Sequence, residues 1–281
     1  MKATPYNKVS EETKRQVIEF YYKNKDIEMP DIAKHFGISF RAVPRILTES
    51  GINTRLKNRY TLDESFFESI ETECQAYWLG FLYADGFVGD EHYNNIVLTS
   101  KDKEVVESFA KSIDFTGNIR QVNGSGYDSS AIHYTINFSS TKMANDLRSL
   151  GLYPGKSTTM KGIPVLKEEL YRHFIRGYFD GDGSIVTSNS CSYHNVAGKR
   201  KKYSYDRPCI SMIGTRPFLE EIEKKMPGNY KYTYVESRTK GMFYLVTHSI
   251  KNAKDVFHFF YDDATYYLKR KYEKFLTVER H

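Results

Sequence analysis

The sequence predicts an α+β protein made of two copies of one unit, preceded by a small all-α domain. Two apolar, helix-like segments, residues 78–86 (WLGFLYADG) and 175–183 (IRGYFDGDG), end alike in Asp-Gly and lie 97 residues apart (182 − 85 = 97). Strand-like and helix-like patterns follow both segments in the same order, which indicates antiparallel sheets backed by helices. The first sixty residues fall outside this repeat and have helical spacing.

The bulk composition agrees with an ordinary globular protein of about two domains. The 281 residues carry a net charge of +6, which makes an anionic partner plausible, although a solvated surface explains the same excess. The three cysteines have neither zinc-ligand spacing nor a disulfide pattern. No N-terminal apolar segment or membrane-length apolar run occurs. We therefore expect an intracellular protein of the cytoplasm, nucleoid or an organelle, not secreted and with no membrane partner.

Residues 1–52 are predicted to form a helix-turn-helix domain. Residues 10–25 begin with Ser10 and two acids, a typical helix start. In residues 29–52, Ala33 would lie where two helices touch and Gly37 in the turn between them. Apolar anchors on the second helix are Val43, Ile46 and Leu47.

The second helix of this domain has the features of a DNA-reading helix. Ser39 is expected to cap it, and Arg41 and Arg45 would then point outward. Pro44 lacks a backbone donor, so the helix is expected to be kinked or to start late. A plain structural helix pair is the alternative. Residues 53–60 form a basic linker that is either a solvated tether or a phosphate-tracking segment, with Arg55, Lys57 and Arg59 as its basic residues.

Residues 61–160 and 161–281 are predicted to be the two copies. Residues 140–147 correspond in sequence to residues 249–256 at an offset of 109 (249 − 140), and Ser, Lys, Ala and Asp recur at the same positions in both. Each copy reads helix, two strands, helix, two strands, helix. The strand at residues 132–138 alternates strictly, with Ile132, Tyr134, Ile136 and Phe138 on one face and His133, Thr135 and Asn137 on the other.

The second copy has an insertion of 16 residues before Pro208, because the offset grows from 97 to 113 (218 − 105 = 113; 113 − 97 = 16). It lies within residues 188–207. We expect a basic hairpin loop with interleaved tyrosines, suited to a nucleic-acid backbone; a solvated charged loop is the alternative. Its basic residues include Lys199, Arg200, Lys201 and Lys202.

The two terminal aspartates need an explanation, because a helix C-terminus disfavours negative charge. Gly80 and Ala84 share one helix face, as do Gly177 and Gly181, so the two helices can pack almost backbone to backbone. By pseudo-twofold symmetry Asp85 would then meet Asp182 and repel it, unless a divalent cation lies between them. Oxygen ligands of this kind suit Mg²⁺. Gly86 and Gly183 are expected to adopt left-handed turns that leave nearby backbone carbonyls free as further ligands.

Residues 78–86 and 175–183 resemble the two signature helices of the single-chain LAGLIDADG homing endonucleases, and the resemblance extends from residue 61 to the C-terminus. It implies two αββαββα units in a pseudo-twofold saddle whose sheets enter the major groove. It also implies Mg²⁺-dependent cleavage of both strands of a long, asymmetric double-stranded DNA site, leaving short 3′ overhangs. Mn²⁺ is expected to substitute for Mg²⁺. The protein is expected to be monomeric, because one chain holds both motifs.

The resemblance also assigns residues. It makes Asp85 and Asp182 the metal ligands, with the backbone oxygens of Ala84 and Gly181 beside them. A basic residue is expected next to each acid, and Lys156 and Lys269 fill these places. The signature has an earlier acid position, which is occupied by Tyr83 in the first copy and by Asp180 in the second. In the family this position is not a metal ligand. Base reading would come from strand residues His133, Thr135 and Asn137.

Two other functions stay open from the sequence. One is a non-cleaving DNA-binding regulator, which combines degenerate units of this kind with a helix-turn-helix, although both aspartates are intact here. The other is an intron maturase, which binds RNA with the same saddle and is compatible as an added activity.

Overall fold

The computed structural model describes residues 3–24, 27–52, 60–123, 131–227 and 232–279. The chain divides into two compact units. The first comprises Met1–Leu62 together with Asp114–Gly117, and the second comprises Asp63–Ile113 and Asn118–His281. The predicted linker residues Arg55, Lys57 and Arg59 lie outside the described residues.

The first unit is helical, in agreement with the sequence. Its helices α1 (Glu11–Lys23), α2 (Met29–His35) and α3 (Ala42–Glu49) surround one apolar core. Ser10 caps α1, since its hydroxyl accepts the Thr13 amide at 3.1 Å. Between α2 and α3, Gly37 has φ +62°, a left-handed turn that favours glycine. The core includes the residues that the spacing predicted: Ala33, Val43, Ile46 and Leu47.

The expected role of Ser39 is wrong. Helix α3 starts at Ala42, its N-cap is Arg41, and no side chain caps it. The reason is Pro44, which the late start places in the first helical turn, where an amide donor is not needed. From Pro44 we expected a helix that is either kinked or starts late, and the structure shows the late start.

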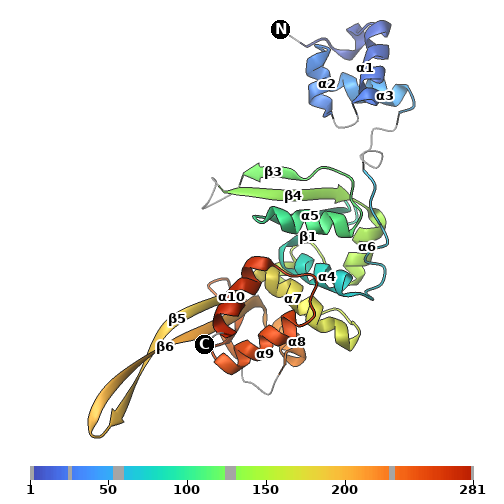
Figure 1. The fold of residues 1–281 in the computed structure, drawn as a ribbon. Helices are drawn as coiled ribbons and strands as arrows, with labels where there is room; N and C mark the ends of the chain where they lie inside the picture. Colours follow the sequence, from blue (N-terminus) through green and yellow to red (C-terminus); the bar gives the residue numbers. More distant parts are fainter. Residues whose placement is uncertain (1–2, 25–26, 53–59, 124–130, 228–231, 280–281) are drawn as a thin grey trace. The chain divides into compact units, whose positions relative to one another are not determined.

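The second unit contains the two predicted copies (Figure 1). Each runs helix, two strands, helix, two strands, helix, and an extra helix, α10 (Lys269–Glu279), ends the chain. The first copy consists of α4 (Glu73–Asp85), β1 (Gly86–Val88), β2 (Asn95–Ser100), α5 (Lys103–Ser112), β3 (Arg120–Asn123), β4 (Ile132–Ser139) and α6 (Thr141–Ser149). The second consists of α7 (Tyr171–Asp182), β5 (Gly183–Val196), β6 (Lys199–Thr215), α8 (Arg216–Lys225), β7 (Thr233–Glu236), β8 (Met242–Thr247) and α9 (Ile250–Tyr261).

Each copy forms one antiparallel four-stranded sheet, and the strand orders correspond: β1-β2-β4-β3 and β5-β6-β8-β7. In β4, Ile136 and Phe138 are buried and Asn137 is exposed, as the alternation predicts. Ile132 differs from the prediction, since it is 47% exposed at the end of the strand. No helix among the described residues combines the length and apolarity that a membrane span requires.

Helices α4 and α7 are the shared centre of the second unit. Helix α4 begins with a Thr72–Gln75 capping box and is buried on every side from Ala76 to Ala84. A Cβ on Gly80 would lie 2.8 Å from the carbonyl carbon of Phe174 and 2.9 Å from the amide nitrogen of Tyr178. These are contacts between two backbones, so the predicted close packing of the helices is confirmed.

Gly177 makes the equivalent contact in the other direction. Its Cβ would lie 2.9 Å from the carbonyl carbon of Tyr77 and 2.9 Å from the amide nitrogen of Phe81. Adding 97 to Tyr77 and Phe81 gives Phe174 and Tyr178, the residues that Gly80 faces. The contacts therefore follow the pseudo-twofold symmetry that the repeat predicts.

Substitution of Gly80 by alanine is expected to destabilise the second unit by about 3 kcal/mol, because backbone atoms cannot move aside as a side chain can. Gly162→Ala is the matched control, since a Cβ at Gly162 meets only Glu221, at 3.8 Å. Urea unfolding of both variants measures the difference. A Gly80→Ala variant as stable as Gly162→Ala would contradict the packing.

The insertion in the second copy is not a loop. Residues 188–207 form the outer parts of β5 and β6, which pair continuously from Gly183↔Met212 to Val196↔Lys199. A two-residue turn, Ala197 (φ +51°) and Gly198 (φ +78°), joins them. Two positive φ angles are typical of the type I′ turn that suits a twisted hairpin. We call the part beyond the sheet, residues 186–209, the ribbon.

Candidate active site

Asp85 and Asp182 are the last residues of α4 and α7, and both side chains reach solvent. The ends of the two helices lie together: a Cβ on Gly181 would be 3.3 Å from Oδ2 of Asp85. The surrounding protein and then the charge of Asp182 raise the pKa of Asp85 from its ordinary value to about 6. The surrounding protein, which displaces part of the water around the carboxyl, also raises the pKa of Asp182. The pair is therefore held together against its own repulsion.

Replacing Asp85 by asparagine is expected to stabilise the metal-free protein at neutral pH. A carboxyl with a raised folded pKa binds more protons in the folded than in the unfolded chain, so stability falls as the pH rises from about 4 to about 6. Asparagine removes this loss. We expect Asp85→Asn to raise the Tm by roughly 1–3 °C at pH 7.5 in EDTA, with no gain at pH 4. Calorimetry at the two pH values measures it; a lower Tm for the variant at pH 7.5 would contradict the account.

The prediction of left-handed turns at Gly86 and Gly183 is wrong. Both glycines are extended, with φ −78° and −83°, because each helix runs directly into a strand. They are glycines for a different reason. A Cβ on Gly86 would lie 2.7 Å from Cα of Leu82, and one on Gly183 would lie 2.5 Å from the Phe179 carbonyl oxygen.

A buried lysine accompanies each aspartate. Lys156, only 6% exposed, lies in a short 3-10 turn and donates to the Ala84 carbonyl at 2.9 Å. Lys271, 4% exposed, donates to the carbonyls of Gly183 at 2.6 Å and Gly181 at 3.4 Å. Ala84 and Gly181 are equivalent in the repeat (84 + 97 = 181), so the two lysines occupy equivalent places.

The assignment of Lys269 to this place is corrected, because Lys269 is exposed at the first position of α10, two residues before Lys271. The carbonyls of Ala84 and Gly181 also differ from expectation. They were expected to be free, and each instead accepts a lysine ammonium hydrogen bond, which leaves one lone pair for another contact. Burial lowers the pKa of Lys271 to about 8, against the attraction of Asp180, Asp85 and Asp182. Burial likewise lowers the pKa of Lys156.

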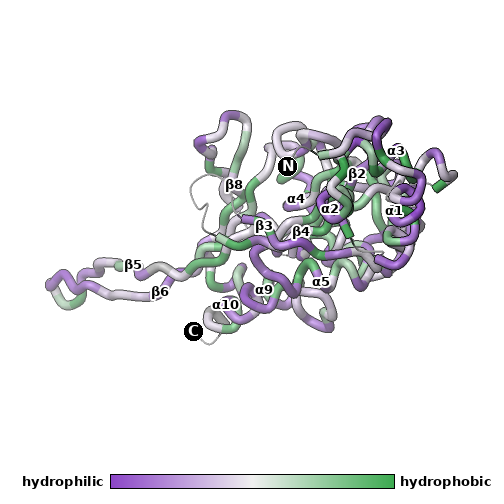
Figure 2. Tube along the Cα trace, turned by 90° about the horizontal axis from the view of Figure 1, so that it is seen from above, coloured by the Kyte–Doolittle hydropathy of each residue, from purple (hydrophilic) through white to green (hydrophobic). Residues whose placement is uncertain are grey.

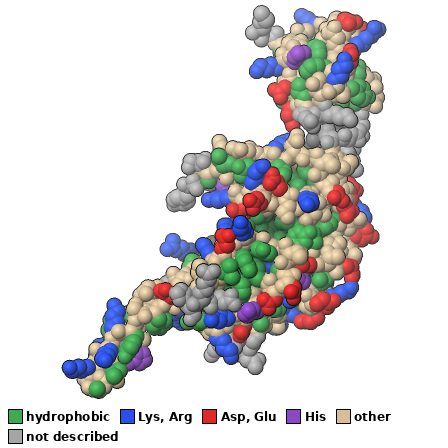
Figure 3. Space-filling view, viewed as in Figure 1, with side chains coloured by type: hydrophobic (Ala, Val, Ile, Leu, Met, Phe, Trp, Pro, Cys, Tyr) green, Lys and Arg blue, Asp and Glu red, His purple; other side chains and the backbone are tan. Residues whose placement is uncertain are grey.

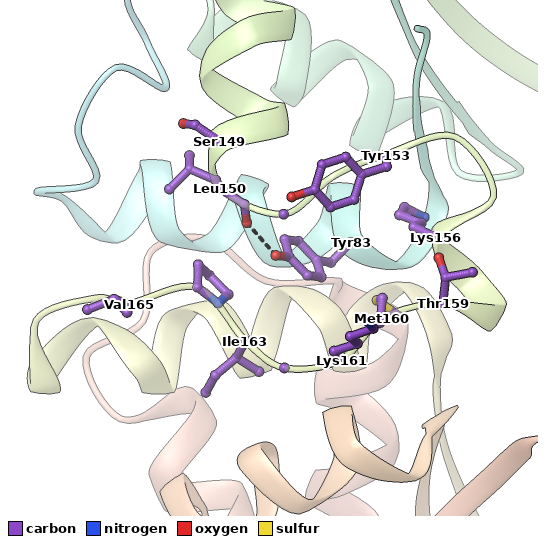
Figure 4. A pocket seen from close by; sticks show the side chains of 13 residues that line it. Tyr83, Ser149, Leu150, Tyr153, Lys156, Thr159, Met160, Lys161, Ile163 and Val165 are labelled. Atoms are coloured by element: carbon purple, nitrogen blue, oxygen red, sulfur yellow. Dashed lines mark hydrogen bonds between the residues drawn. The ribbon is translucent and has the colours of Figure 1, made fainter.

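The residues at the earlier acid position of the two segments anchor the chain that leads to these lysines. The Tyr83 hydroxyl donates to the Leu150 carbonyl, as Figure 4 shows beside Lys156. Its equivalent, Asp180 (83 + 97 = 180), accepts the Leu268 amide at 2.6 Å and the Tyr77 hydroxyl at 3.0 Å. Both residues therefore have positioning roles, and neither reaches the Asp85–Asp182 pair through these bonds.

An ion pair between buried Arg176 and partly exposed Glu73 extends this anchoring. Arg176, fully buried, donates to Glu73 at 2.6 Å and to the carbonyls of Phe260 and Tyr266 at 2.6 and 2.8 Å. Glu73 in turn accepts the amide of Thr265 at 2.8 Å. Removing Glu73 would leave the buried Arg176 charge uncompensated. The hydrogen bonds of the pair to residues 260–266 fix the segment before α10. The sequence contains no signal for this network, because its members are far apart along the chain.

The residues at the helix ends fit a hard divalent cation. Two solvent-accessible carboxylates with raised pKa values supply anionic oxygens, and Ala84 and Gly181 offer backbone oxygens nearby. Within the described part of the chain, His, Cys, Asp and Glu form no group of three or more that could hold a metal. Two carboxylates suit Mg²⁺, which retains water and accepts phosphate oxygens as its other ligands.

The predicted DNA-contacting residues lie in three places. His133 and Thr135 are half-buried and Asn137 is exposed on the open face of β4, where Thr99 donates to the Thr135 hydroxyl at 2.8 Å. In the first unit, Arg41 is exposed, whereas Arg45 pairs with Glu49 at 2.9 Å and lies over the Tyr6 ring. Lys199, Arg200, Lys201 and Lys202 are exposed on β6. The structure thus distributes them over the first unit, β4 and β6.

Solved structures share this architecture. The LAGLIDADG homing endonuclease I-LtrWI, bound to its target DNA, matches with a TM-score of 0.50 over 74% of this chain and 89% of that chain. The fold is that of the LAGLIDADG meganucleases. A point mutant of the meganuclease I-SmaMI matches equally, at 0.50 over 75% of this chain and 90% of that one. Both are 13% identical to this sequence, so they establish the fold alone. The sequence matches no protein-family model and no curated protein.

Proposed function

We propose that this protein is a site-specific DNA endonuclease that makes a metal-dependent double-strand cut with short 3′ overhangs in a long, asymmetric site. The observation that carries the proposal is the pairing of Asp85 with Asp182 at the ends of two tightly packed helices, each with a buried lysine. A carboxylate at a helix C-terminus is electrostatically unfavourable, and here it occurs twice in equivalent places. Such a repeated exception is typical of a functional site. I-LtrWI, which shares the fold, is a homing endonuclease seen with its target DNA.

In this proposal the aspartates hold Mg²⁺, for which Mn²⁺ substitutes, and the bound cation supplies Lewis-acid activation of the phosphate and of water. Lys156 and Lys271 hold positive charge beside the reacting phosphates. Charge fixed in advance in this way stabilises a developing negative charge without reorganisation. The cut needs no covalent nucleophile from the chain.

The remaining surfaces would bind the duplex. His133, Thr135 and Asn137 lie on an open sheet face that fits base reading in the major groove. Lys199 and Lys201 of β6 would contact phosphates. Arg41, at the N-terminus of α3, would let the first unit add a second DNA contact. Arg45 could take part in this contact only if its ion pair with Glu49 broke. Because one chain holds both motifs, we expect the monomer to act.

Cleavage of a randomised duplex library, with the ends sequenced, tests the proposal. In Mg²⁺ we expect discrete double-strand ends with short 3′ overhangs at one family of sites, and in EDTA no ends. Site-selective binding without any cut would contradict the endonuclease and favour a regulator of transcription. Selective binding to structured RNA in the same buffer would instead indicate a maturase.

A further inference from the structure

The ribbon extends beyond the sheet that carries it. Strand β8 pairs with β6 from Ile210 to Thr215, whereas β5 and β6 continue outward as a pair from Val186↔Cys209 to Val196↔Lys199. Ten steps of about 3.3 Å give a length of about 33 Å. Figures 1 and 2 show these two strands side by side, clear of the helices of the second unit.

Such a ribbon needs a partner. A hairpin of two strands without a core is marginally stable in water, and the side chains of β6 from Lys199 to Arg207 are all exposed. The ribbon holds five basic residues and one acid, a net charge of +4 (5 − 1), out of +6 for the whole chain. Figure 3 shows these lysines and arginines gathered along it. A partner that complements this surface is a polyanion.

The pairing register divides the basic residues between two faces. Gly183 lies on the inner face, because its Cβ would meet Phe179 of α7. Residues alternate from there, so Tyr193 and Asn195, with their partners Lys202 and Arg200, lie on the inner face as well. The other face continues the open surface of the sheet, and its outer residues are His194, Lys199, Lys201, Tyr203, Tyr205 and Arg207.

Both faces carry side-chain contacts, and the ammonium groups of Lys199 and Lys201 take no part in them. On the inner face the Arg200 guanidinium lies over the Tyr193 ring at 4.5 Å, and Ser204 donates to Asn189 at 2.6 Å. On the open face the His194 ring lies 5.5 Å from the Tyr203 ring. Lys199 and Lys201, like Lys202 on the inner face, form no ion pair with any residue that the structure describes. Beside them the rings of Tyr203 and Tyr205 are 46% and 44% exposed. Uncommitted ammonium groups and flat rings suit a nucleic-acid backbone.

We propose that the open face of the ribbon, with Lys199 and Lys201, binds one further helical turn of duplex DNA beyond the site covered by the two sheets. This inference rests on the proposed function, since it needs DNA on the open face of the sheet. The length supports it, because about 33 Å corresponds to one turn of B-DNA, about 10 base pairs. The major groove is wide enough for a two-stranded ribbon. The footprint would therefore be longer on the side of the second copy.

Matched double variants test the face. Lys199→Thr with Lys201→Thr and Arg200→Thr with Lys202→Thr each remove two positive charges from alternate positions of one strand, so they match in charge and differ in the face. Arg200→Thr also removes the contact with the Tyr193 ring. Binding is measured on the mapped site and on sites trimmed by 10 base pairs at either end. We expect trimming at one end to weaken wild type and Arg200→Thr/Lys202→Thr roughly tenfold. The Lys199→Thr/Lys201→Thr variant should bind both lengths equally.

The salt dependence gives an independent readout. Loss of two phosphate contacts lowers the slope of log K against log salt by about 1.8, so wild type should lose roughly tenfold more affinity than Lys199→Thr/Lys201→Thr between 50 and 200 mM salt. A shortened variant, with residues 189–206 replaced by Asn-Gly, keeps the pairing of Ser188 with Arg207. Its affinity should also be the same for the full and the trimmed site.

Equal effects of the two double variants, or a larger effect of Arg200→Thr/Lys202→Thr, would overturn the inference. A shortened variant that still binds the trimmed site more weakly than the full site would also overturn it. All these variants retain Asp85 and Asp182 and should still cut the trimmed site. If wild type binds but cuts no DNA, the proposed function fails, while the trimming experiment, which measures binding, still decides the role of the ribbon.

Discussion

Asp85→Asn and Asp182→Asn are each expected to abolish double-strand cleavage, with a loss on the order of 10³-fold or more. Each substitution keeps the shape of the side chain and removes an anionic oxygen from a pair that is held together at the ends of α4 and α7. DNA binding should persist or strengthen, because a negative charge near the phosphates is lost. Gel analysis of cut product and a binding assay on the same duplex separate the two effects.

The matched control for these variants is Asp263→Asn. Asp263 is exposed and has φ +58°, a conformation that asparagine tolerates well, so this substitution removes one charge without strain. It should cut at nearly the wild-type rate. Retention of substantial cleavage by either Asp85→Asn or Asp182→Asn would place the chemistry elsewhere in the molecule.

Lys271→Met is expected to lower the cleavage rate by roughly 10²–10³-fold, and Lys156→Met by a similar factor, since each removes a fixed charge beside one aspartate. Lys269→Met is the matched control, because it removes the same group from the same helix two residues away. That variant should cleave close to the wild-type rate. Single-turnover rates on the mapped site measure all three.

The three rates also decide whether Lys269, which the sequence assigned, or Lys271, which the structure places beside the helix end, is the functional lysine. A greater loss in Lys269→Met than in Lys271→Met would contradict the equivalence of Lys156 and Lys271. Circular dichroism of each variant shows whether a loss of activity reflects unfolding instead.

The centre of the fold could be predicted because its signals are local. Gly80, Gly177 and the two Asp-Gly endings share one spacing, and this spacing indicated two helices in backbone contact with their acids together. The structure confirms the packing residue by residue. Alternation in β4 likewise predicted which side chains face outward, except at the strand end, where Ile132 has no core to enter.

The errors arise where tertiary context overrides a local rule. Glycine after a helix usually indicates a left-handed turn, but Gly86 and Gly183 begin strands, and crowding against Leu82 and Phe179 excludes a side chain. Lys271 was missed because the segment before α10 does not follow the repeat. Its position depends on bonds from Asp180 and Arg176, which lie about ninety residues away in sequence, and no spacing rule reaches that far.

The insertion shows a third limit. Its charge and tyrosines were evident, but a run of basic residues predicts a loop as readily as a strand. What fixes the ribbon is the continuous pairing of β5 with β6 and the turn at Ala197 and Gly198. The division of its lysines into two faces follows only from that register.

The central claim is that Asp85 and Asp182 together form one metal site, and Mn²⁺ titration followed by electron paramagnetic resonance tests it most directly. At pH 7.5 we expect the wild-type protein to bind Mn²⁺, and both Asp85→Asn and Asp182→Asn to lose most of this binding. Binding by wild type should also fall as the pH drops through about 6, because protons compete for Asp85. Mn²⁺ binding that is the same in wild type and both variants would contradict the account.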